Sequence, residues 1–116
     1  MAASKRSSAS VTILLICVAS ILATGAVSFF AFERLAHLED EVAYLFQART
    51  MALGRLTVPS PSRPEAFWTP FVLDHHGERF GKYAPGWPAV LGLGILAAGG
   101  KAIWLVNPLL AALALY

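Results

Sequence analysis

Residues 11–32 read VTILLICVASILATGAVSFFAF, and this apolar run determines how the rest of the chain is interpreted. It contains no charged residue, and as a helix it would be roughly 33 Å long, at about 1.5 Å per residue. The hydrocarbon core of a bilayer is about 30 Å thick. The length and the lack of charge therefore predict a transmembrane helix over residues 11–32.

The residues around this run leave its processing and its orientation open. Lys5 and Arg6 precede it, and small residues from Ala23 to Ala26 would suit cleavage of a signal peptide. The run is longer than the usual signal core, which favours a retained helix after a short N-terminal tail, residues 1–10. Two basic residues before the helix favour a cytoplasmic N-terminus, but more basic residues follow it, so charge alone does not settle the orientation.

A second apolar block runs from Tyr83 to the last residue of the sequence. We expect a second transmembrane helix at 83–99 and a tight turn at Gly99–Lys101. A third helix is expected at 102–116, with Asn107 as an alternative start. No polar flank follows this helix, and a helix that ends inside lipid leaves its last carbonyl groups unsatisfied. This pattern indicates the N-terminal part of a larger multi-spanning protein.

Residues 33–82, between the two blocks, hold all seven acidic residues and six of the nine basic ones. Charges are costly in hydrocarbon, so we expect this segment to lie outside the bilayer. Its first part has an acidic start, a helical repeat of apolar residues and Gly54 as a stop, which predict an amphipathic helix at about 40–53. The net charge of +2 forms no basic face, which argues against nucleic acid as a partner.

The rest of the polar segment is predicted to be extended or turned. Three prolines between 59 and 64 exclude a regular helix. Residues 67–73 are expected to be extended, and a turn at 74–78 closes a small hairpin against 79–83. Neighbouring metal-capable side chains in a tight turn rarely converge on one ion, so we expect no metal site, with a divalent ion as the alternative. These side chains are Asp74, His75, His76 and Glu78.

The predicted fold class is an all-α membrane protein. It consists of one transmembrane helix, a polar loop outside the bilayer with a short amphipathic helix, and a transmembrane helical hairpin. Two local motifs accompany this order. The loop opens with Asp40-Glu41, followed by Tyr44, Gln47-Ala48-Arg49 and Gly54, and it closes with Lys82-Tyr83-Ala84-Pro85-Gly86.

Over about residues 31–115 these motifs, in this order, resemble the start of the GT-C membrane glycosyltransferases. That group includes the protein O-mannosyltransferases and the bacterial lipid A aminoarabinose transferases. One departure is Ala84, which replaces the first of two prolines usual in the closing motif. The resemblance implies an integral, multi-pass protein of the bacterial inner membrane, with its N-terminus in the cytoplasm and residues 33–82 outside.

The implied activity is transfer of a sugar from a polyprenyl-phosphate donor to an acceptor outside the cytoplasm. The partners would be the lipid bilayer, the lipid-linked sugar and the remaining helices of the full-length protein, with no cofactor beyond a divalent metal as an open possibility. The resemblance makes Asp40 the catalytic carboxylate. It makes Glu41 and Lys82 substrate-binding residues, with Lys82 near the lipid-linked phosphate.

Each of these assignments has a simpler structural alternative. Asp40 is also suited to capping the amphipathic helix, and Glu41 to a solvated face. Lys82 is suited to reaching the lipid headgroups. For the whole chain, the alternative to an enzyme is a small non-enzymatic membrane anchor or assembly subunit. A transporter fragment is disfavoured because the apolar blocks lack the ionisable residues that such pathways use.

Overall fold

The computed structural model describes residues 2 to 115 and divides the chain into two compact units. One unit combines Met1–Arg34 with Trp104–Tyr116, and the other is Leu35–Ile103. The ends of two predicted segments, Met1 of the tail and Tyr116 of the third helix, lie outside the described residues.

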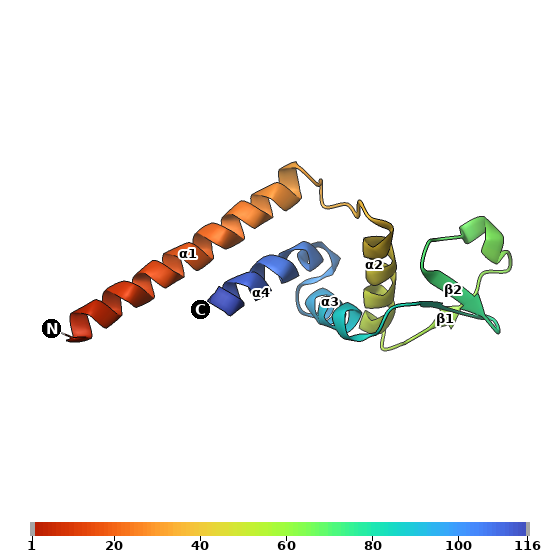
Figure 1. Ribbon diagram of the computed structural model, residues 1–116. Helices are drawn as coiled ribbons and strands as arrows, with labels where there is room; N and C mark the ends of the chain where they lie inside the picture. Colours follow the sequence, from red (N-terminus) through yellow and green to blue (C-terminus); the bar gives the residue numbers. More distant parts are fainter. Residues whose placement is uncertain (1, 116) are drawn as a thin grey trace. The chain divides into compact units, whose positions relative to one another are not determined.

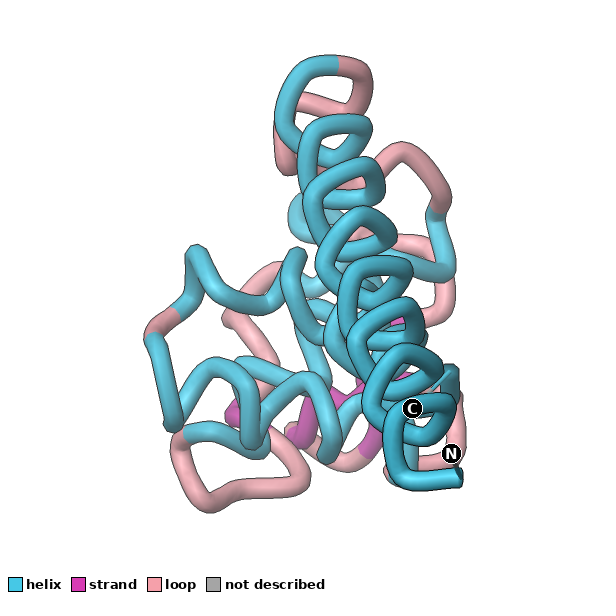
Figure 2. The backbone as a smooth tube through the Cα atoms, turned by 90° about the vertical axis from the view of Figure 1, so that its left-hand side faces the viewer, coloured by secondary structure: helices cyan, strands magenta, loops and turns pink. Residues whose placement is uncertain are grey.

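The first unit is built on helix α1, Ala2–Phe30, which is 29 residues long and unbroken (Figures 1 and 2). It extends back through the segment predicted as a tail. Its part Ser10–Phe30 has a mean hydropathy of 2.5, and only 6% of that window is buried by the rest of the chain. Within residues 2–115 this is the one helix long and apolar enough to cross a membrane.

The end of α1 follows from local backbone geometry. The N–H groups of Ala31 and Phe32 both bond to the carbonyl of Val27, and these bonds close the last turn. Glu33 and Arg34 then adopt positive φ values of 51° and 56°, which a continuing right-handed helix does not allow. The helix therefore ends next to the first charged residues after the apolar run.

Helix α4, Val106–Leu115, packs along α1 within the same unit. The buried thiol of Cys17 donates a hydrogen bond of 3.4 Å to the carbonyl of Ala112 at this contact. A 3-10 helix, Gly100–Leu105, precedes α4, so the predicted helix over 102–116 forms in two parts. The α-helical part starts next to Asn107, the alternative start expected from the sequence.

The core of the second unit is the packing of α2, Glu39–Ala52, against α3, Gly86–Ala98. Small residues allow the two helices to approach closely. Ala48 is fully buried, and a Cβ added at Gly92 would lie only 3.1 Å from its carbonyl oxygen. The helix predicted at 40–53 forms within one residue of those bounds. The helix predicted at 83–99 is shorter, and its 13 residues extend for only about 20 Å.

A three-stranded antiparallel sheet completes the second unit, so the expectation of an all-α fold is wrong here. The strands are β1, Val58–Pro59, β2, Val72–His75, and β3, Glu78–Gly81, and their order is β1-β3-β2. The predicted hairpin forms between β2 and β3. His76 and Gly77 both have positive φ values, 50° and 80°, as a two-residue type I′ turn requires.

The strand that sequence patterns miss is β1, which lies in the proline-rich segment predicted as a loop. Pro59 has no backbone N–H to donate to a neighbouring strand. It is tolerated because β1 is an edge strand that pairs only with β3. The observed structure of residues 67–73 also differs from the extended segment predicted there. A 3-10 helix, Pro64–Phe67, reaches into it, and the strand begins only at Val72.

Candidate functional site

The start of α2 is shaped by the side chain of Glu41. One of its carboxylate oxygens, Oε2, accepts hydrogen bonds from the backbone N–H of His37, at 2.8 Å, and of Leu38, at 3.3 Å. A carboxylate at the third helical position that reaches back in this way satisfies donors that the helix itself leaves open. Glu41, expected to bind substrate, therefore lies at the start of α2 and also stabilises it.

Asp40 lies in the first turn of the same helix and is exposed. Its Oδ1 accepts a hydrogen bond of 2.5 Å from the hydroxyl of Tyr83, which is 43 residues further along the chain. Burial and the bond to the Asp40 carboxylate raise the pKa of Tyr83 from 10.0 to about 12. The phenol is therefore a neutral donor to Asp40 over the whole range in which enzymes work.

The ring of Tyr83 is held by two other aromatic rings. Tyr44, one helical turn after Asp40, lies 4.7 Å away between ring centroids, and Phe71 contacts the ring edge-to-face at 5.7 Å. Aromatic pairs at these distances stabilise each other beyond simple burial. We call Asp40, Tyr44, Phe71, Lys82 and Tyr83 the Tyr83 cluster.

Lys82 joins this cluster through its ammonium group. Its Nζ lies 3.6 Å from the ring centroid of Phe71 and 5.0 Å from that of Tyr83, which are favourable cation–π distances. The side chain is exposed, and its backbone N–H bonds to the carbonyl of Phe71 at 2.9 Å. Lys82 and Asp40 thus contact the same tyrosine.

The segment that carries Lys82 and Tyr83 is fixed to α2 by Gln47. Its side-chain Nε2 donates to the carbonyls of Gly81, at 3.3 Å, and of Tyr83, at 2.9 Å. Gln47 is 7% exposed, and a Cβ added at Gly81 would lie 2.5 Å from its side-chain carbons. Glycine at 81 therefore allows the end of β3 to lie directly against α2.

Helical spacing explains how α2 contributes to this arrangement. Asp40, Tyr44 and Gln47 recur at intervals of four and three residues, so they share one face of the helix. All three contact the Gly81–Tyr83 segment. The motif with Tyr44 and Gln47 indicates from the sequence that these residues share one face of the helix. It does not indicate which segment packs against that face. The roles of Tyr83 and Gln47 were therefore not expected.

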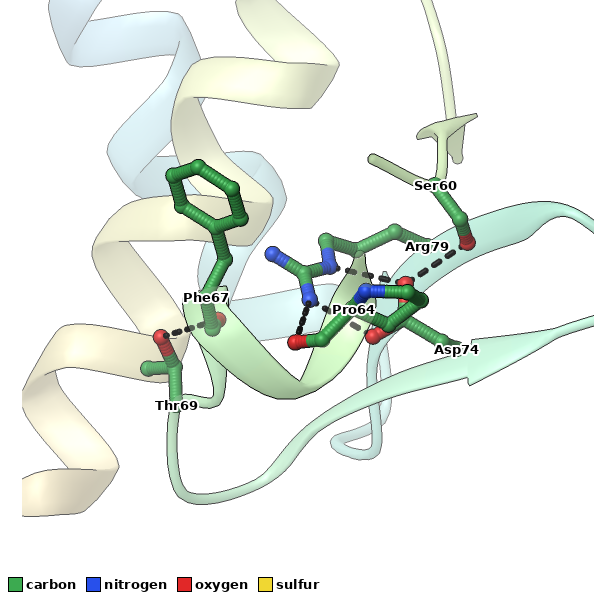
Figure 3. A network of polar contacts seen from close by, with 6 residues as sticks. All are labelled: Ser60, Pro64, Phe67, Thr69, Asp74 and Arg79. Carbon is green, nitrogen blue, oxygen red and sulfur yellow. Dashed lines mark hydrogen bonds and ion pairs between the residues drawn. The ribbon is translucent and has the colours of Figure 1, made fainter. Parts of the chain in front are cut away.

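The two strands beside the hairpin turn are joined by an ion pair. Asp74 and Arg79 face each other across the strands, and both carboxylate oxygens accept from the guanidinium group, at 2.9 and 2.6 Å (Figure 3). Ser60 also donates to Asp74 at 2.6 Å, and Arg79 donates to the carbonyl of Pro64 at 3.5 Å. These bonds fix the loop before β2 to the hairpin.

The electrostatics of the hairpin agree with this structural role. The hydrogen bond from Arg79 holds the pKa of Asp74 below its ordinary value, and that from Ser60 adds to the effect. His75 and His76 contact each other, with ring centroids 4.0 Å apart. In the described part of the chain, no three His, Cys, Asp or Glu side chains come together in a way that could hold a metal ion.

Comparisons with protein-family models, curated proteins and solved structures find no match to this chain. The chain is mostly helical, with one helix long and apolar enough to span a membrane, and a separate unit has an exposed carboxylate and an exposed amine beside one tyrosine.

Proposed function

We propose that this chain is part of a GT-C membrane glycosyltransferase, which moves a sugar from a polyprenyl-phosphate donor to an acceptor outside the cytoplasm. One observation carries the proposal. Asp40 and Lys82, the two residues that the resemblance assigns to catalysis and to phosphate binding, both contact Tyr83 although they are far apart in sequence.

The chemistry of the two side chains suits sugar transfer. Asp40, an exposed carboxylate, would orient the acceptor hydroxyl and take its proton as the new glycosidic bond forms. The bond between the sugar and the donor phosphate breaks, and negative charge collects on the departing phosphate. The ammonium group of Lys82 would offset this charge.

The proposal includes the location of the site at a membrane surface. In support, α1 contains an apolar stretch of 21 residues, enough to cross the bilayer as an anchor. The charged residues begin at Glu33, directly after this stretch. The polar loop, residues 33–82, would then lie on the outer side of the bacterial inner membrane, at the depth of the donor phosphate. Further helices of a multi-pass protein would enclose the donor.

The direct test is transfer by the complete protein in proteoliposomes, with labelled polyprenyl-phosphate mannose and aminoarabinose as donors. Asp40→Asn keeps the shape of the side chain and its bond to Tyr83 but removes the base. We expect it to lower the transfer rate by at least about 100-fold, the usual contribution of a general base.

The matched control is Glu39→Gln, which neutralises the neighbouring exposed carboxylate and should leave transfer within about twofold of the wild-type rate. Transfer by Asp40→Asn at the rate of the wild-type protein would refute the catalytic role. Failure of the wild-type protein with every donor, while it remains inserted and folded, would favour a membrane anchor or assembly subunit instead.

A further inference from the structure

At the centre of the cluster lies Tyr83, a residue to which the resemblance assigned no role. We infer that Tyr83 is a positioning residue, which holds the Asp40 carboxylate in one orientation so that its second oxygen faces the acceptor hydroxyl. The inference rests on the proposed function of Asp40 and extends it to a residue at the other end of the loop.

The first step of the argument is that Asp40 needs an external restraint. It lies in the first turn of a helix and is exposed, so its side chain would otherwise exchange among several rotamers. The hydroxyl of Tyr83 binds one particular oxygen, Oδ1, at 2.5 Å. With Oδ1 occupied, Oδ2 is the oxygen that would accept the proton of an acceptor.

The second step is that Tyr83 is itself held firmly enough to act as a restraint. Its ring contacts those of Tyr44 and Phe71, and its backbone carbonyl accepts from the buried amide of Gln47 at 2.9 Å. A group fixed at both its backbone and its ring loses little entropy when its hydroxyl binds a carboxylate. This makes the tyrosine a preorganised donor.

The third step concerns protonation. A phenol that ionised near neutral pH would repel Asp40 instead of binding it. Burial and the nearby carboxylate keep the hydroxyl of Tyr83 protonated well into the alkaline range. The restraint on Asp40 is therefore present at every pH at which the enzyme would be assayed.

The test compares Tyr83→Phe with Tyr44→Phe in the complete protein. Both variants keep an aromatic ring in the same cluster, but only Tyr83→Phe removes the donor to Asp40. We expect kcat to fall about tenfold in Tyr83→Phe, the usual effect of losing a hydrogen bond to a charged group, with KM for the acceptor within about twofold. Tyr44→Phe keeps the ring contact with Tyr83 and removes no donor to Asp40, so kcat should fall less in Tyr44→Phe than in Tyr83→Phe.

Two outcomes would overturn the inference. One is an equal loss of kcat in the two variants, which would indicate a general packing effect. The other is a wild-type kcat in Tyr83→Phe, combined with the loss expected for Asp40→Asn. That second result would remove Tyr83 from the mechanism and leave the proposed function intact. A wild-type rate in Asp40→Asn would instead refute the proposed function itself.

A spectroscopic readout checks the contact independently of activity. The ultraviolet difference between the wild-type protein and Tyr83→Phe isolates the ionisation of this tyrosine. At pH 11 about one tenth of Tyr83 should be ionised, against about nine tenths for an ordinary tyrosine. Asp40→Asn should raise the ionised fraction, because it removes a negative charge that disfavours ionisation of the phenol. An unchanged fraction would refute the contact.

Discussion

The substitution Gly81→Ala adds a single methyl group. It tests how the Gly81–Tyr83 segment is fixed to α2. Gly81 lies at the end of β3 with an ordinary strand backbone, so alanine adds no conformational strain there. The added Cβ would, however, lie 2.5 Å from Cγ and Cδ of Gln47 and 2.6 Å from its Oε1. Real side chains do not approach so closely, so Gln47 would have to move.

The size of the effect follows from the position of Gln47. Its side chain is buried, and moving it breaks the two hydrogen bonds that it donates to the carbonyls of Gly81 and Tyr83. Overpacking of a buried site costs about 1–3 kcal/mol. We therefore expect Gly81→Ala to lower the free energy of unfolding of the second unit by about 2 kcal/mol, which lowers its melting temperature by roughly 10 °C.

The assay is thermal unfolding of the full chain in detergent, followed by near-ultraviolet circular dichroism. The matched control is Gly86→Ala, because a Cβ at Gly86 meets no atom within 4 Å. Alanine in the first turn of α3 should be neutral or slightly stabilising.

A double-mutant cycle identifies the cause. In a Gln47→Ala background the added methyl group has space, so Gly81→Ala should then cost less than about 0.5 kcal/mol. Additive effects of the two substitutions, or a melting temperature of Gly81→Ala equal to that of the wild type, would refute the contact between Gly81 and Gln47.

Two other predictions concern the hairpin and α1. The pKa of Asp74 is lowered in the folded protein, so its contribution to stability is complete above its ordinary value of 3.8 and is lost as the pH falls below that value. The protection factors of the β2–β3 amides against hydrogen exchange should fall as the pH is lowered below about 4 in the wild type, but not in Asp74→Asn; equal behaviour of the two proteins would contradict this. In α1, Leu22→Asp places a charge in the middle of the apolar stretch and should cost about 2.5–3.5 kcal/mol of insertion free energy. The wild-type chain should remain in the membrane pellet after alkaline carbonate extraction while more of Leu22→Asp is released, and equal retention would argue against insertion of α1.

Local patterns predicted several elements well because their causes are local. The acidic start, the helical repeat and Gly54 place α2 within one residue of its observed bounds. The turn chemistry around Gly77 indicates the β2–β3 hairpin, because a type I′ turn depends on its own two central residues. The apolar run before Glu33 indicates α1, whose length and hydropathy are properties of a continuous segment.

Other features depend on contacts between distant segments and were missed. The edge strand β1 is two residues long, and it exists only because β3 offers a free edge beside Val58 and Pro59. The prolines that correctly exclude a helix there say nothing about that partner. The third strand of the sheet was missed for this reason.

The candidate site also combines features that the sequence reveals with features that depend on tertiary packing. Its two proposed charged residues, Asp40 and Lys82, are visible in the sequence because they stand out in their motifs. What joins them is the bond between Asp40 and Tyr83, together with the two bonds from Gln47. These contacts cross more than thirty residues, and pairing at that separation follows from how α2, α3 and β3 pack together. Periodicity and turn chemistry act over a few residues, whereas the meeting of remote groups depends on shape and volume throughout the folded unit.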